Sequence, residues 1–75
     1  MDEATREPRA AIFVNGEPRA LSDDRTLPAL LASLSLRAEW VLVELNGEPL
    51  PRARYASTTL APGDRLELAM PMAGG

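Results

Sequence analysis

Apolar and polar residues follow two different periods along the chain, and these predict strands around one helix. Residues 10–14 form an apolar run that ends at Asn15-Gly16. Both residues of this dipeptide tolerate the positive φ of a two-residue turn, so we expect a hairpin that returns over residues 17–22. Pro18 lacks a donor N–H, which confines the returning strand to the edge of the sheet.

The period changes to that of a helix over residues 26–36. Four leucines are spaced three or four residues apart and predict one apolar stripe: Leu27, Leu30, Leu31 and Leu34. A helix of this kind buries its stripe by lying on a sheet. Thr26 and Leu27 are both candidates for the N-cap, because Pro28 restricts the backbone of the residue before it.

Alternation of apolar and polar residues returns after the helix. Residues 40–45 and 65–70 each alternate with the period of a strand. A second Asn-Gly turn follows the first of these strands, and Pro62-Gly63-Asp64 forms a turn before the last one. Residues 48–51 contain two prolines and can form only a short edge strand, while residues 52–57 are expected to be a loop or a single turn.

The order of these elements predicts one α+β domain, a mixed sheet of four to five strands with one helix packed across one face. The domain is expected to span residues 10–70. Residues 1–9 are charged and show no period, which predicts a disordered N-terminal extension. Residues 71–75 are expected to be a flexible C-terminal tail.

Only one face of the predicted sheet is covered by the helix. Alternation assigns seven side chains to the covered face: Ile12, Val14, Leu21, Val43, Leu66, Leu68 and Met70. It assigns five to the open face: Phe13, Arg19, Leu42, Glu67 and Ala69. Phe13 and Leu42 would form an exposed apolar patch there, which is typical of a docking surface.

The chain lacks the residue types that most enzymes use. It contains no histidine and no cysteine, and all eight basic residues are arginine. An imidazole base, a thiolate nucleophile and soft metal ligands are therefore missing, so we expect a protein that is not an enzyme and that binds no metal or cofactor itself. Trp40 and Tyr55, each the only residue of its kind, are interpreted as edge packing and not as a ligand-stacking site.

Charge and hydropathy exclude two classes of partner. The formal net charge is -3 and the arginines are scattered, so no basic surface for nucleic acid is expected. No apolar run approaches the roughly 20 residues of a membrane span. The charged start differs from a signal peptide, and we therefore expect a cytoplasmic protein without a membrane partner.

The last five residues carry the most specific chemistry. Five extended residues reach roughly 17 Å, enough to thread a narrow channel in another protein. Gly74 has no Cβ and gives the tail clearance, while Gly75 presents a carboxylate that is ionised at neutral pH. This group needs a leaving group before a nucleophile attacks its carbon. The chain has no phosphate-binding loop, so the activation is expected from a partner that uses ATP.

Contacts with partners are expected from apolar side chains of the open face and of the tail. These are Phe13, Leu42, Met70, Met72 and Ala73. Two glycines at a chain end are by themselves better explained by the lack of constraint there.

An ordered set of segments, however, runs from residue 12 to residue 75. It consists of Ile12-Phe13-Val14-Asn15-Gly16-Glu17, Thr26-Leu27 with Leu30-Leu31, Val43-Glu44-Leu45-Asn46-Gly47-Glu48, Pro51-Arg52 before Tyr55, Gly63-Asp64-Arg65-Leu66-Glu67, and Gly74-Gly75. In this order the segments resemble the ThiS family of sulfur carriers of thiamine biosynthesis.

The resemblance implies a ubiquitin-like β-grasp fold and a reaction path. In that family a ThiF-type, E1-like enzyme adenylates the terminal glycine with ATP. Sulfur is then transferred to give a thiocarboxylate, and the thiazole synthase ThiG takes the sulfur for the thiazole of thiamine. The resemblance implies that Gly75 carries the sulfur and that Gly74 provides clearance for the tail.

Three alternatives stay open. A MoaD-like small subunit of molybdopterin synthase, or a carrier for another sulfur pathway, would share the fold and the diglycine. A protein modifier would attach the activated glycine to lysines of other proteins, although this chain has no lysine with which to build polymers. A plain interaction domain would use only its Phe13 and Leu42 face.

Overall fold

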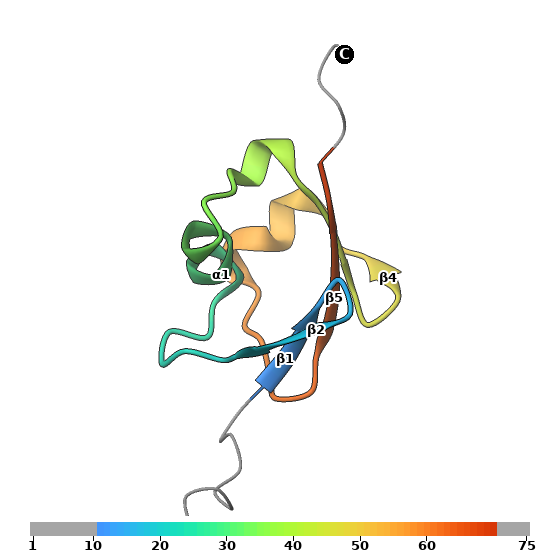
Figure 1. Ribbon diagram of the computed structural model, residues 1–75. Coiled ribbons are helices and arrows are strands. Elements are labelled where there is room, and N and C mark those ends of the chain that lie inside the picture. The colour runs from blue at the N-terminus through green and yellow to red at the C-terminus, as the bar shows by residue number, and fades with distance from the viewer. Residues whose placement is uncertain (1–10, 71–75) are drawn as a thin grey trace, which may run out of the picture.

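A five-stranded mixed sheet with one α-helix on one face makes up the fold (Figure 1). The computed structural model describes residues 11–70, so the predictions for residues 1–9 and 71–75 lie outside the described range. The elements are β1 (Ala11–Val14), β2 (Glu17–Ala20), α1 (Leu27–Ser33), β3 (Leu42–Leu45), β4 (Glu48–Pro49) and β5 (Arg65–Ala69), with 3₁₀ helices η2 (Ala38–Trp40) and η3 (Arg52–Ser57). The predicted α+β class, with four to five strands and one helix, is confirmed.

The last strand lies in the middle of the sheet. The strand order is β2-β1-β5-β3-β4, with β5 parallel to β1 and antiparallel to β3. The two hairpins, β1–β2 and β3–β4, therefore form the two halves of the sheet, and β5 joins them. Helix α1 and η3 lie on the same side of this sheet (Figure 1).

Both Asn-Gly dipeptides form the predicted turns. Asn15 and Gly16 have φ of 51° and 86°, and Asn46 and Gly47 have φ of 53° and 86°. Positive φ at both central residues is the requirement of a type I′ turn, whose twist matches that of the flanking strands. The first turn places Val14 opposite Glu17, and this fixes the register of the hairpin.

Thr26 is the N-cap of α1, which decides between the two predicted candidates. Its backbone is extended and its Oγ1 accepts a hydrogen bond from the Ala29 N–H at 3.2 Å. Its hydroxyl donates to the Asp24 carboxylate at 2.8 Å. The hydroxyl therefore satisfies one of the free N–H groups of the first turn while its own proton is also bonded.

The helix ends three residues earlier than predicted, at Ser33 and not at residue 36. The Leu36 N–H donates to the Leu31 carbonyl at 2.8 Å, and the Ser35 N–H donates to the Ala32 carbonyl at 3.0 Å. This pair of bonds is a Schellman motif, in which the residue at position C′ adopts a left-handed conformation. Ser35 occupies that position with φ of 61°. Glycine is usual at this position, so the end of the helix could not be predicted from a glycine signal.

We expect Ser35→Gly to stabilise the protein by a few tenths of a kcal/mol up to about 1 kcal/mol. A left-handed conformation costs a residue with a Cβ about 1 to 2 kcal/mol, and the greater freedom of glycine in the unfolded chain offsets part of the gain. Urea denaturation of both proteins measures the difference. A lower midpoint for Ser35→Gly would contradict the strain assigned to this position.

Nine side chains form the core between the sheet, α1 and η3. They are Ile12, Val14, Leu27, Leu31, Val41, Val43, Tyr55, Leu60 and Leu66, and each is buried. Every one is apolar or aromatic, and within the described residues no charged side chain is buried. Burial of these side chains provides the hydrophobic stabilisation on which a domain of this size depends.

Tyr55 belongs to this core and not to an edge. Its hydroxyl donates to the Val41 carbonyl at 2.9 Å and accepts from the Val43 N–H at 3.2 Å. These bonds tie η3 to the start of β3. Strand β3 begins at Leu42, two residues later than predicted, because residues 38–40 form the 3₁₀ helix η2. Trp40 is 56% exposed, so the prediction that it packs against an edge is wrong.

We expect Tyr55→Phe to destabilise the fold by about 1 to 3 kcal/mol, because the buried Val43 N–H loses its acceptor while the ring still fills its place. The Val41 carbonyl keeps a bond from the Arg52 guanidinium at 3.0 Å. Urea denaturation checks the value. Equal stability of the two proteins would mean that water or another group satisfies Val43.

Candidate docking face and base of the tail

Strand β5 is held on both sides by the side chains of the turn asparagines. Asn15 accepts from the Leu68 N–H at 2.8 Å and donates to the Leu68 carbonyl at 3.3 Å. Asn46 accepts from the Arg65 N–H at 2.9 Å and donates to the Asp64 carboxylate at 3.1 Å. Each asparagine therefore serves twice, since it forms a turn and also fixes the strand that leads to the C-terminal tail.

This clamp gives the tail a fixed base. The Asn15 side chain bonds to β5 just beyond the end of β1, where no residue of β1 is left to pair with Leu68. Residues 71–75 start one position after the last described residue, Met70. Their full reach of roughly 17 Å is then measured from a defined point on the sheet. Gly74 and Gly75 themselves lie outside the described residues.

The open face carries the two apolar residues predicted for it, but at opposite ends. Phe13 pairs with Arg65 at the start of β5, and Leu42 pairs with Ala69 at its end. Four residues of strand separate these positions, which corresponds to about 13 Å. Leu42 is 52% exposed, while Phe13 is half-buried beneath the Arg65 guanidinium, 4.8 Å from its ring centroid. Phe13 and Leu42 thus do not form the single patch that the sequence predicted.

Two residues lie differently from the prediction. Arg19 pairs with Ile12, whose side chain is in the core, so Arg19 belongs to the helix side of the sheet and not to the open face. Met70 was predicted in the core but is 52% exposed. Both line an open groove of about 510 Å³ together with Leu34, Leu36 and Leu68. The helix ends beside this groove, which is why no residue of α1 covers Met70.

Two features of this region were not predicted from the sequence, although Glu67 was correctly assigned to the open face. Trp40 is exposed at the start of β3, and Glu44 lies directly opposite Glu67 on the open face. The exposure of Trp40 depends on the 3₁₀ helix η2, which the alternation of apolar and polar residues did not predict. The pairing of Glu44 with Glu67 could be found only from the register between β3 and β5.

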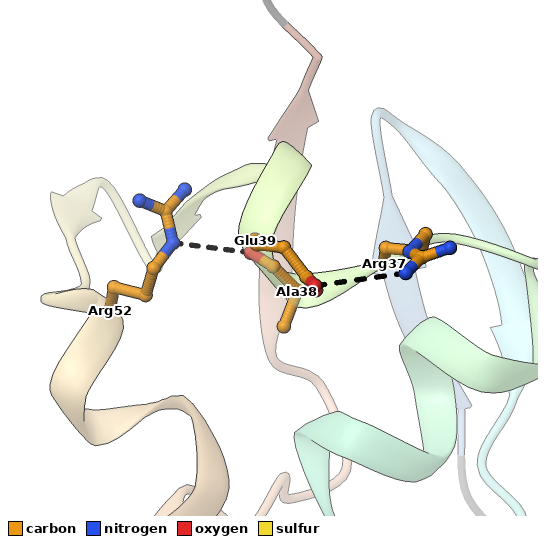
Figure 2. Close-up of polar contacts among 4 residues, drawn as sticks. All are labelled: Arg37, Ala38, Glu39 and Arg52. Carbon is orange, nitrogen blue, oxygen red and sulfur yellow. Dashed lines mark hydrogen bonds and ion pairs between the residues drawn. The ribbon is translucent and has the colours of Figure 1, made fainter.

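Arg52 belongs to the fold and is not a free docking residue. Its Nε donates to the Ala38 carbonyl at 3.1 Å, as Figure 2 shows, and its Nη2 donates to the Val41 carbonyl. The guanidinium thereby fixes η2 on the fold. The neighbouring ion pair of Arg37 and Glu39, 3.8 Å long, is exposed and contributes little to stability (Figure 2).

Among residues 11–70 no group of three or more His, Cys, Asp or Glu side chains could hold a metal ion. The same residues include no helix that is long and apolar enough to cross a membrane. The arrangement provides a central strand that is hydrogen-bonded on both sides and ends beside exposed apolar side chains.

A family model and two solved structures are similar to this chain. A family model described as the ThiS family matches residues 12–75. The crystal structure of the thiamine biosynthesis protein ThiS from Geobacter metallireducens superposes with a TM-score of 0.71 at 38% identity, covering 87% of this chain and 99% of that one. A solution structure of a thiamine biosynthesis protein from the same organism gives a TM-score of 0.69 at 38% identity, covering 87% of both chains.

Two sequence relatives differ in length. A thiazole synthase of Paramagnetospirillum magneticum is 38% identical over 64 residues, which are 85% of this chain and 20% of that protein. This chain thus spans about a fifth of the length of that relative. The uncharacterized protein ycf40 of Pyropia yezoensis is 40% identical over 65 residues, which are 87% of this chain and 92% of that protein.

Proposed function

Because the chain belongs to the ThiS family of small sulfur carriers, with the ubiquitin-like β-grasp fold and no catalytic role of its own, we propose that it carries sulfur on Gly75 for the thiazole of thiamine. The observation that supports this most is the extent of the family match, which runs from residue 12 through both glycines. The central position of β5 supports it too, since that strand leads to the tail from a clamped base.

The proposed reaction has two steps, and this chain is the substrate in both. A carboxylate oxygen of Gly75 attacks the α-phosphorus of ATP on a ThiF-type enzyme, which releases pyrophosphate and leaves an acyl-adenylate. A sulfur nucleophile, formally hydrosulfide, then adds to the carbonyl carbon and expels AMP. The product is a thiocarboxylate, and neither step changes an oxidation state. The nucleotide binds to the activating enzyme, and this chain itself binds no cofactor.

The tail and the sheet beside it have different proposed roles. Gly75 holds the adenylate and then the sulfur, and Gly74 lets the tail approach the walls of a channel because it has no Cβ. The proposed partner contacts are Phe13, Leu42, Met70, Met72 and Ala73. Of these, Leu42 and Met70 are exposed at the end of β5 that leads to the tail, which favours them over Phe13 for contacts around a channel entrance.

The proposed acceptor of the sulfur is the thiazole synthase ThiG. A relative named thiazole synthase contains a segment similar to this chain in about a fifth of its length. A carrier-like segment within such a protein supports a direct meeting of carrier and synthase. The thiocarboxylate would deliver its sulfur in the synthase active site, and the carrier would return as a carboxylate.

The test is the mass of the intact protein. After incubation with a purified ThiF-type enzyme, ATP and a sulfide source, the mass should rise by the replacement of one oxygen by one sulfur. Consumption of this product by thiazole synthase, and not by the large subunit of molybdopterin synthase, supports the thiamine pathway. A mass that stays unchanged with an enzyme that thiocarboxylates a known ThiS protein would refute the proposal.

A further inference from the structure

The large apolar side chains that the fold leaves exposed gather at the base of the tail. Among the described residues these are Trp40, Leu42 and Met70, exposed by 56%, 52% and 52%. Leu42 pairs with Ala69 in the antiparallel strands β3 and β5. Trp40 lies two residues before Leu42, and Met70 lies one residue after Ala69. Both therefore lie toward the same end of the sheet. In Figure 1, η2 lies at the end of the molecule where β5 ends. We call these three residues the rim.

Trp40 is the largest residue of the rim and is held in place before any partner binds. Its backbone N–H donates to the Arg37 carbonyl at 2.9 Å and closes the turn of η2. Arg52 bonds to the Ala38 carbonyl (Figure 2) and to the Val41 carbonyl. These two carbonyls lie on either side of Trp40 in the sequence. Because the backbone is already fixed, only the side-chain torsions of Trp40 have to be ordered on binding, and tryptophan is enriched among interface anchors.

The open face next to Leu42 carries two carboxylates that lie side by side. Glu44 and Glu67 face each other directly across β3 and β5, and like charges in this position destabilise a sheet. Within residues 11–70 no ion pair involves either carboxylate. The guanidinium of Arg65, on the same face, lies over the Phe13 ring. From Leu42 inward, the open face is therefore first apolar and then acidic.

We propose that Trp40 anchors the activating enzyme at the entrance of the channel that receives the tail, and that a basic side chain of that enzyme lies against Glu44 and Glu67. The inference rests on the proposed function. The reach of five residues, roughly 17 Å, brings the rim against the surface around that entrance whenever Gly75 is at the nucleotide. A cation of the partner also relieves the repulsion between the two carboxylates.

A second copy of this chain fits the face less well. Homodimers form mostly through one patch that contacts itself. Such a contact centred on Glu44 and Glu67 would place four carboxylates together, whereas a basic partner removes the repulsion.

The first experiment separates binding from chemistry at Trp40. Pyrophosphate release by the ThiF-type enzyme is measured against the concentration of the full-length carrier. For Trp40→Ala we expect KM to rise about tenfold or more, as for a truncated interface anchor, with kcat within about twofold. The thermal midpoint should stay unchanged because the side chain is exposed. Trp40→Gln, which keeps a long side chain, should give the same result, and Pro62→Ala, in the turn at the far end of β5, is the control.

The second experiment tests the charge of the partner through two effects of opposite sign. We expect Glu44→Gln with Glu67→Gln to raise the thermal midpoint, since the repulsion is removed, yet to raise KM severalfold and to weaken its dependence on salt. Asp23→Asn removes an exposed carboxylate elsewhere and should change neither the midpoint nor KM.

The outcomes distinguish this inference from the proposed function. If the wild-type chain is not adenylated, the proposed function fails and the inference fails with it. If the wild type and Pro62→Ala are adenylated alike and both Trp40 variants match them, only the role of the rim is wrong. A loss confined to the thiazole synthase step would also overturn it, because the proposed occupant is the activating enzyme.

Discussion

Deletion of Gly75 is expected to abolish thiocarboxylate formation while the thermal stability stays unchanged. The shortened chain still ends in a carboxylate, that of Gly74, but this group falls short by one residue, about 3.3 to 3.6 Å. A displacement of 1 Å from the reactive geometry can cost about 100-fold in rate, so a whole residue should remove the activity. Intact mass after incubation with the activating enzyme, ATP and sulfide gives the measurement.

Two controls interpret this deletion. A chain without residues 1–9, which lie outside the family match, should be thiocarboxylated at the wild-type rate. Gly75→Ala keeps the length of the tail and adds one Cβ, so it should retain more activity than the deletion if reach is the limiting factor. Sulfur transfer by the chain that lacks Gly75 would show that the carboxylate of this residue is not the carrier group.

The strands and the helix could be predicted because their signals are local. The Asn15-Gly16 and Asn46-Gly47 turns have the positive φ that this dipeptide favours, and they fix two hairpins without any tertiary information. The leucine spacing located α1, of which Leu27 and Leu31 are buried. In each case the residues that decide the structure are neighbours in the sequence.

The boundaries that were wrong depend on contacts between distant residues. Trp40 was predicted to begin a strand but ends η2, where Arg52 and Tyr55 bond to the backbone on either side of it. The end of α1 was missed because Ser35 takes the place of the usual glycine. Neither the acceptor of a distant arginine nor the strain at a serine is visible in the local pattern.

The candidate site, too, could be predicted only where its signals are local in the sequence. The diglycine end and the family resemblance were accessible from the sequence, and the resemblance is confirmed by the family match. Which side chains accompany the tail depends on the register of β5 with β1 and β3. That register separates Phe13 from Leu42, and it places Glu44 opposite Glu67. A register is a property of two strands at once, so alternation within one strand cannot supply it.

Alternation along the sequence could have assigned Arg19 to the correct face of the sheet. It lies two positions from Leu21, so the two side chains share a face of the sheet. Leu21 packs against the core, and Arg19 pairs with the buried Ile12. The assignment of Arg19 to the open face was therefore inconsistent with that of Leu21 before the structure was known.

Replacement of Leu31 by alanine is expected to cost about 2 to 5 kcal/mol of unfolding free energy, as is usual when a buried leucine is truncated and leaves a cavity. Leu31 is 2% exposed in the core between α1 and the sheet, and its carbonyl also accepts the bond that closes the helix. Small domains have total stabilities of about 5 to 15 kcal/mol, so this loss is a large fraction of the whole.

The same variant separates folding from carrier function in the opposite sense to the deletion of Gly75. Urea denaturation should show a lower midpoint, while thiocarboxylation per folded molecule stays at the wild-type rate, because Leu31 lies in the core and does not belong to the proposed partner contacts. Leu42→Ala is the matched control, a leucine that is 52% exposed and should leave the midpoint nearly unchanged. A folded Leu31→Ala protein with a slow reaction would show that packing under β5 sets the position of the tail, and that the Asn15 and Asn46 clamps do not suffice to hold it.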